Sequence, residues 1–228
     1  MVTKRNGSVR RSHLPVSRAA TLMCAALATG ALLTGCGNDD GDAAKTDASE
    51  AGRAASPSTS SDGGALTDDQ AERKALVPKA KVGYEDALKS ALATVDKSKP
   101  VSIELKGTPE KPSWEAEVAT DDGSAHSVSV DAVSGKAGQA QADKDQDADD
   151  KRELADRLKK ATVTPQQAAE TATNKTKGTV TSVELDDTDH DRTVLWSVDV
   201  VTTNDWNKTT FDVDAANRKI LREHVDKD

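Results

Sequence analysis

Two runs of acidic residues carry the side chains that bind hard cations such as Ca²⁺. In the first run an aspartate occupies every second position, as in a calcium-binding loop, at Asp143, Asp145, Asp147 and Asp149. The glycine that permits the sharp turn of such a loop is missing, because Ala148 or Asp150 stands in its place. The run therefore favours a solvated linker. The alternative is a weak Ca²⁺ site with Asp145, Asp147 and Asp149 as ligands.

The second acidic run falls in a predicted hairpin loop. Its members are Asp186, Asp187, Asp189, His190 and Asp191. A polar, solvated loop is the first interpretation, and a weak metal site is the alternative. No cofactor is predicted apart from weakly bound Ca²⁺ at these runs and the lipid on the cysteine described below.

Side chains for catalysis are scarce. Beyond residue 36, histidines stand at His126, His190 and His224, and none has the spacing of a zinc motif. The sequence has no G-x-S-x-G nucleophile motif and no phosphate-binding glycine loop. Glu115 and Glu117 are paired carboxylates, but the alternation of their predicted strand turns both toward solvent. We therefore predict a protein that is not an enzyme.

The N-terminus has the organisation of a bacterial export signal. Five basic residues and no acidic residue lie in its first 18 positions, and the apolar run 19–33 that follows is shorter than the roughly 20 residues of a spanning helix. The run ends in Leu33-Thr34-Gly35-Cys36, which is similar to a lipoprotein lipobox. We expect cleavage of the leader 1–35 between Gly35 and Cys36, and a diacylglycerol on the Cys36 thiol. Cys24 leaves with the leader.

The chain after the leader is strongly acidic. Without the leader, 26 basic residues remain against 39 acidic ones, a formal charge of −13. This charge excludes binding to nucleic acid and attachment to anionic lipid heads, so the lipid anchor is the only expected link to a membrane. A cationic partner fits better. We expect a monomer on the outer face of the cytoplasmic membrane. Arg10-Arg11 leave twin-arginine and ordinary secretion open as export routes.

Residues 36–66 lack any large apolar side chain before Leu66. Such a segment cannot bury enough surface to offset the entropy of ordering, so it is expected to be a disordered tether. The tether would let the folded part stand away from the membrane.

The remainder contains an internal repeat. Four segments recur in the same order at offsets of 80 to 83 residues, which indicates duplication. The matches are Val101–Leu105 with Thr181–Leu185, Trp114 and Val118 with Trp196 and Val200, and Val130–Ala132 with Val213–Ala215. The predicted domains are 67–142 and 143–228, the second including an acidic linker.

Each copy is predicted to hold two helices followed by three or four antiparallel strands. In copy one, Thr67 and Gln70 form a capping-box pattern, and apolar residues over 84–95 step by three and four. In copy two, helices are expected over 149–160 and from Thr164-Pro165 onward. The strands alternate apolar and polar residues, so one sheet face packs on helices and the other meets water. The fold class is α+β.

The unit resembles the PepSY domain family. The resemblance rests on the amphipathic helix, the strands Val101–Leu105 and Trp114–Val118, and the segment Val130–Lys136 with its D-A-x-T-G-like turn. Copy two has Asn217-Arg218 where copy one has Ser134-Gly135, so we expect Asn217 to take the left-handed conformation in a turn shifted by one. The resemblance implies a non-catalytic module that binds or regulates an extracellular protein, including inhibition of a peptidase. A Ca²⁺-binding or sensory lipoprotein and a structural cell-wall spacer are the alternatives.

Trp206 is the one aromatic residue that falls in a predicted turn, Thr203–Asn207. No core face is expected there, and aromatic side chains at loop tips often anchor partners. The first interpretation is that its ring folds back on its own hairpin. If the chain has a partner-contact surface, Trp206 is the best candidate for it.

Overall fold

The computed structural model describes residues 65–188 and 191–226. The leader, the Gly35–Cys36 cleavage site and the tether up to residue 64 lie outside these residues, as do Asp189 and His190. The described residues all belong to one compact unit. Its helices are α1 Asp68–Leu76, a 3₁₀ turn Val77–Lys79, α2 Tyr84–Leu92, α3 Ala148–Lys160 and α4 Pro165–Lys175. Its strands are β1 Lys99–Thr108, β2 Lys111–Ala119, β3 Ala125–Asp131, β4 Gln141–Ala142, β5 Thr179–Asp187, β6 Val194–Val201, β7 Lys208–Asp214 and β8 Ile220–Asp226.

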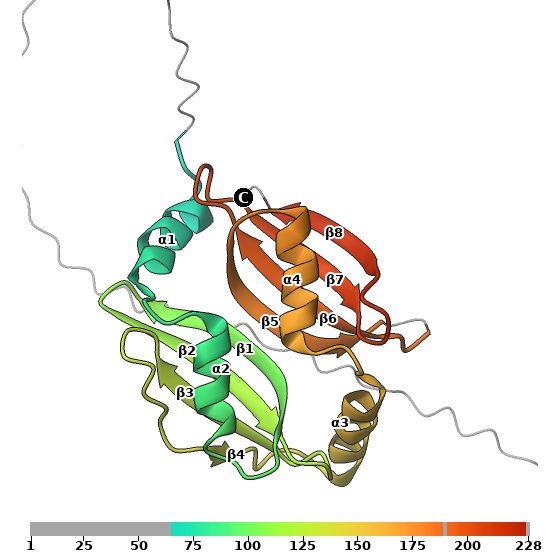
Figure 1. Ribbon diagram of the computed structural model, residues 1–228. Helices are drawn as coiled ribbons and strands as arrows, with labels where there is room; N and C mark the ends of the chain where they lie inside the picture. The colour runs from blue at the N-terminus through green and yellow to red at the C-terminus, as the bar shows by residue number, and fades with distance from the viewer. Residues whose placement is uncertain (1–64, 189–190, 227–228) are drawn as a thin grey trace, which may run out of the picture. The chain divides into compact units, whose positions relative to one another are not determined.

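All eight strands belong to a single antiparallel sheet in the order β4-β3-β2-β1-β5-β6-β7-β8. The predicted α+β class and tandem repeat are confirmed, and the sheets of the two repeats are joined edge to edge by β1 and β5. Figure 1 shows α2 and α4 on the same face of this sheet, whereas α1 and α3 lie beyond the ends of its strands. In the described part of the chain, no helix covers the other face.

The core lies between the sheet and helices α2 and α4. The predicted alternation is confirmed in β2, where Trp114, Ala116 and Val118 are buried between more exposed residues. Both core tryptophans also donate a hydrogen bond from the ring nitrogen to the segment that leads into the helix above. Trp114 bonds the Val82 carbonyl at 2.9 Å, and Trp196 bonds the Val163 carbonyl at 2.8 Å. The repeat therefore extends to hydrogen bonds, and each tryptophan fixes a helix to its sheet.

Capping boxes begin three of the four helices. The predicted box at Thr67 starts α1, and boxes at Asp147 and Thr164 start α3 and α4. In each, the cap side chain accepts from the third helical N–H and the third side chain accepts from the cap N–H. Pro78, expected to end the first helix, lies in the 3₁₀ turn that follows α1.

In both repeats, the turn after the third strand has a residue in the left-handed conformation at the same position. Gly135 has a φ of 75°, and Arg218 has a φ of 67°. The N–H of each donates to the carbonyl four residues earlier, at 2.8 and 3.0 Å. The expectation that Asn217 takes the left-handed conformation in a shifted turn is wrong. Arg218 takes the left-handed conformation instead, and its side chain forms a 2.8 Å ion pair with Glu170.

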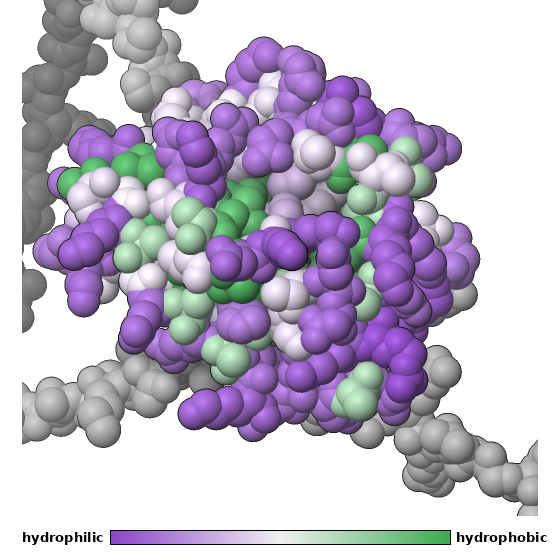
Figure 2. Space-filling model, turned by 60° about the horizontal axis from the view of Figure 1, so that its bottom comes forward, coloured by the Kyte–Doolittle hydropathy of each residue, from purple (hydrophilic) through white to green (hydrophobic). Residues whose placement is uncertain are grey.

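The surface of the described residues is mainly polar. The face in Figure 2 is largely hydrophilic, with hydrophobic residues gathered in small areas near its middle. The large hydrophobic residues that are exposed are Leu66, Val133, Leu221 and Val225. None of the described helices has the length and apolar character needed to cross a bilayer.

Candidate functional site

The sheet face that carries no described helix is called the open face. Two rows of polar residues cross it through both repeats. The first row is Ser127, Glu117, Ser102, Glu184, Ser197, Asp212 and Arg222. The second row is Ser129, Glu115, Glu104, Ser182, Asp199, Thr210 and His224. The predicted outward direction of Glu115 and Glu117 is thus confirmed, and the sheet joins them to carboxylates from the second repeat.

Some acidic side chains of these rows are neutralised and others are not. Glu104, Asp199 and Asp212 form ion pairs at 2.9, 3.5 and 2.7 Å with basic residues of the described chain. The ion pairs of the described residues include none for Glu117 or Glu184. The middle of the open face, around the junction of β1 and β5, is therefore negative.

The surroundings of Glu117 and Glu184 disfavour their charged forms. Desolvation raises the pKa of the Glu117 carboxyl above its usual range, Asp143 adds to the rise, and Arg157 opposes it. The pKa of Glu184 is also raised, first by desolvation of its carboxyl, although the residue is exposed, and then by Asp186 and other acidic neighbours. Like charges brought together, with Arg157 opposing them only in part, therefore store repulsion on this face.

Glu184→Gln is expected to raise the melting temperature at pH 7 by about 1–2 °C. A carboxyl whose pKa is raised by folding holds its proton more tightly in the folded state, so its charged form destabilises the fold and this penalty disappears as pH falls. Gln mimics the protonated form, so the gain should vanish at about pH 4, near the ordinary pKa of 4.5. Calorimetric melting at both pH values checks this, with Glu110→Gln in the exposed β1–β2 turn as control. An equal gain at both pH values would contradict it.

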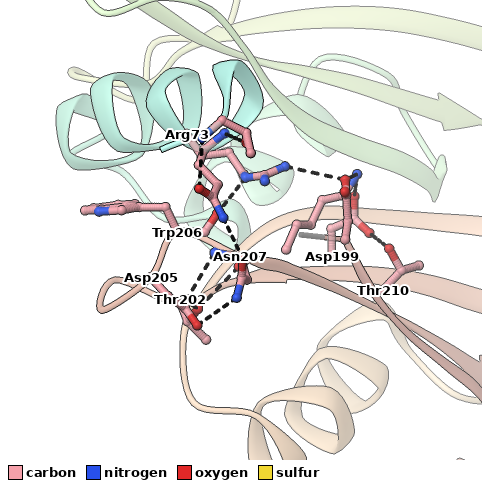
Figure 3. Close-up of polar contacts among 11 residues, drawn as sticks. Arg73, Asp199, Thr202, Asp205, Trp206, Asn207 and Thr210 are labelled. Atoms are coloured by element: carbon pink, nitrogen blue, oxygen red, sulfur yellow. Dashed lines mark hydrogen bonds and ion pairs between the residues drawn. The ribbon is translucent and has the colours of Figure 1, made fainter. Parts of the chain in front are cut away.

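The first helix of repeat one contacts the β6–β7 turn of repeat two (Figure 3). Arg73 Nε donates to the Trp206 carbonyl at 2.7 Å, and Gln70 Nε2 donates to Asn207 Oδ1 at 2.8 Å. Arg73 Nη1 also lies 3.5 Å from Asp226 Oδ2 on β8. The N-terminal helix thus fastens the far end of the second repeat.

Trp206 lies in a turn between strands, as predicted. Its φ of 59° is left-handed, and its N–H donates to the Thr202 carbonyl at 3.0 Å. The expectation that no core face lies there is wrong, because the half-buried Trp206 packs against the hydrophobic core. Figure 3 shows its ring directed away from the polar contacts of the turn. Binding of a partner by Trp206 remains a prediction.

Arg73→Ala is expected to lower the free energy of unfolding by about 1–2 kcal/mol, because the Trp206 carbonyl and Asp226 both lose a partner. Urea unfolding followed by tryptophan fluorescence measures it. The control is Arg152→Ala, which removes an exposed ion pair with Asp149 and should cost less than about 0.5 kcal/mol. Equal effects of the two variants would show that the contact between α1 and the turn adds no stability.

At the opposite end of the sheet, the start of repeat two makes a matching contact with a turn of repeat one. Gln146, just before α3, bonds the β2–β3 turn of repeat one through Gly123 O at 2.8 Å and Ala125 N at 3.0 Å. Gly123 has a φ of 84°, and a Cβ there would lie 1.8 Å from the Lys151 carbonyl oxygen. Only glycine lets helix α3 approach so closely. The first helix of each repeat therefore contacts a turn of the other repeat.

The first acidic run has local structural roles. The Asp147 carboxylate accepts the N–H groups of Asp149 and Asp150 at 2.7 and 3.0 Å, and these bonds lower its pKa. The Asp143 carboxylate accepts the Asp145 N–H at 2.9 Å. Within residues 65–188 and 191–226, no group of three or more His, Cys, Asp or Glu residues could hold a metal ion. The geometry gives the calcium alternative no support.

Sequence reasoning missed Leu195, which is 5% exposed and lies in register with the open face, where the next two alternate residues of β6 are the polar Ser197 and Asp199. The sequence did carry a signal for it. The residue before the strand tryptophan is the polar Ser113 in repeat one and the apolar Leu195 in repeat two. Sequence reasoning also missed Glu104 and Glu184 as neighbours of the Glu115–Glu117 pair. Their approach depends on the β1–β5 pairing, for which no single segment carries a signal.

Comparison with known proteins gives one family and two similar structures. Residues 81–137 and 162–224, together more than half of the chain, match the sequence pattern of the PepSY family, described as "Peptidase propeptide and YPEB domain". A candidate lipoprotein from Clostridium difficile 630 is 23% identical, over 64% of this chain and 94% of that chain, with a TM-score of 0.41. The YpmB protein from Bacillus subtilis is 16% identical, over 63% of this chain and 98% of that chain, with a TM-score of 0.27. Comparison with curated proteins gave no match.

Proposed function

The chain belongs to the PepSY family, with one domain in each repeat, and from this premise we propose that it is a non-catalytic envelope lipoprotein that binds an extracellular protein. The observation that carries this proposal is the joining of the two domains into one sheet whose open face carries no helix in the described part of the chain. A polar sheet face of this extent is suited to contact another protein.

A peptidase is the partner class that we propose. The support is the family description, which names peptidase propeptides. Binding that blocks substrate access needs no catalytic side chain on the inhibitor. It needs a preorganised surface, because ordering a surface on binding costs affinity. The cross-repeat contacts of α1 and α3 supply such rigidity.

Location on the membrane follows from the N-terminus in this proposal. The leader 1–35 and the Leu-Thr-Gly-Cys sequence ending at Cys36 support export and acylation. The charge of −13 after the leader opposes direct contact with anionic lipid heads. The lipid would therefore hold the PepSY domains near the cell surface, where secreted peptidases emerge.

The test is capture of secreted proteins with the chain that lacks the leader and the lipidated cysteine, residues 37–228. The tagged protein is immobilised, culture-medium proteins are passed over it, and retained proteins are identified by mass spectrometry. Each retained peptidase is then assayed with and without the chain. Retention of a peptidase and a slower rate of hydrolysis are expected. A thermally unfolded sample is the control, and the proposal fails if the folded chain retains no protein and slows no peptidase.

A further inference from the structure

The open face of repeat two contains a hollow of about 410 Å³. Its lining includes Leu195 and Ser197 on β6, Asp186 at the end of β5, and Asp212, Leu221 and Arg222 on β7 and β8. The hollow thus combines aliphatic and charged side chains. It lies on the sheet face that carries no helix in the described part of the chain.

Leu195 breaks the alternation of β6. It lies in register with Asp186 on β5 and Asp214 on β7, which makes it a single apolar residue between two acidic neighbours. Repeat one has Ser113 at the matching place, bonded to Glu115 at 3.3 Å. Leu221, 40% exposed, lines the same hollow. Local rules of strand composition are often broken where a surface has a function.

The carboxylates beside the hollow lack full neutralisation. Glu184 and Asp186 lie two residues apart on β5 and therefore point to the same face. Asp186 has a long ion pair with Arg157, at 3.8 Å, and none is formed by Glu184 among the described residues. Asp186, Glu104 and Glu117 each raise the electrostatic cost of charging Glu184, and Arg157 lowers it. An incoming cation would relieve this repulsion.

The spacing of these groups matches an extended peptide. Leu195 opposes Asp186, so Glu184 is its diagonal neighbour at roughly 7–8 Å. In an extended segment, side chains at positions i and i+2 point the same way and lie about 6.5–7 Å apart. One such segment can place an aliphatic side chain in the hollow and a cationic side chain on the carboxylates.

We propose that the hollow binds an extended segment of the extracellular partner, with a Leu, Ile or Val side chain between Leu195 and Leu221 and a Lys or Arg two residues away at Glu184 and Asp186. This inference rests on the proposed function and assigns its contact surface. Charge complementarity and the aliphatic lining select this occupant over an acidic or purely polar segment. Repeat one lacks the aliphatic part, so the two domains contribute unequally to binding.

Fluorescence anisotropy with labelled octapeptides tests the proposal on the same lipid-free chain, residues 37–228. The probe has Leu and Lys two positions apart in a Ser/Thr background. One comparison peptide has Leu and Lys adjacent, and another has Glu in place of Lys. The first is expected to bind at least about tenfold more tightly than either comparison, with an affinity that falls as salt rises. Equal binding of all three peptides, or no binding, would overturn the proposal.

Variants of the chain locate the binding. Leu221→Ser should weaken binding of the Leu-x-Lys peptide about tenfold and, because Leu221 is partly exposed, should leave the melting temperature nearly unchanged. Glu184→Gln should weaken binding and flatten its salt dependence. Glu115→Gln makes the same charge change on the open face of repeat one and should have no effect. The hollow is the wrong site if Leu221→Ser and Glu184→Gln bind as the parent chain does. If Leu221→Ser still retains the secreted partner in the capture experiment, the proposed function stands and this surface does not.

Discussion

Cys36→Ser is expected to move the protein from the membrane fraction to the culture medium. The Cys36 thiol is the only group at the lipobox that can carry the diacylglycerol, and Cys24 is the only other cysteine in the sequence. The acidic body has no charge attraction to anionic lipid, and none of its described helices could span a bilayer. Cell fractionation and immunoblotting measure the shift, and mass spectrometry of the N-terminal peptide shows the lipid mass on the parent chain alone.

The control for this experiment is Cys24→Ser, which removes the leader cysteine and should leave the distribution and the N-terminal mass unchanged. The N-terminal mass also reports whether the leader has been removed. A Cys36→Ser chain that has lost its leader and still stays with the membrane would show that something other than the lipid holds the protein there.

Trp196→Ala is expected to lower the free energy of unfolding by about 3–5 kcal/mol, and Trp114→Ala by a similar amount. Each side chain is almost fully buried, at 2% and 1% exposure. Each substitution would leave a large cavity and deprive the carbonyl of Val163 or Val82 of its ring N–H donor. Urea unfolding monitored by circular dichroism gives the free energy. Replacement by Phe keeps most of the packing and should cost about 1–2 kcal/mol for the lost hydrogen bond.

Trp206→Ala is the matched control, since Trp206 is half-buried and its contact with Arg73 is through its backbone carbonyl. Its effect should be clearly smaller than that of either core tryptophan. We also expect each core variant to unfold in one transition, because the sheet is continuous through both repeats. Two separate transitions, with only one shifted by Trp196→Ala, would show that the repeats unfold independently.

Signals close together in sequence predicted the elements well. The Thr67–Gln70 capping box, the Thr164-Pro165 helix start and the alternation around Trp114 and Trp196 each report on a few neighbouring residues. Whether such a segment forms a helix or a strand depends on local backbone geometry and on which of its faces packs against the core. The segments that recur at an offset of about 80 residues are also short, and each can be recognised from a few neighbouring residues. The duplication could therefore be predicted as well.

Contacts between the repeats could not be predicted in this way. The pairing of β1 with β5 and the approach of α1 to the Trp206 turn depend on how two finished units fit together. Trp206 looked like an exposed anchor because its own segment is a turn, whereas the helix that contacts this turn is 133 residues away in sequence at Arg73. The spacing of Asp143–Asp149 could not decide between a calcium site and a linker, because Asp147, one of the proposed ligands, also serves as the cap of α3.

The junction of β1 and β5 has a symmetry that bears on how the protein assembles. Ser102 pairs with Glu184, and Glu104 pairs with Ser182, around the central pair of Ile103 and Val183. Ser102 matches Ser182 and Glu104 matches Glu184 in the repeat. Equivalent residues therefore make equivalent contacts across the junction, as in a two-fold symmetric homodimer, but within one chain. Covalent linkage replaces a bimolecular association by an intramolecular one, at an effective concentration on the order of millimolar or above. The pairing of the two repeats is therefore independent of protein concentration. Unlike a true homodimer, the chain can also place Leu195 in one half and Ser113 in the other, so that each molecule carries a single copy of the hollow.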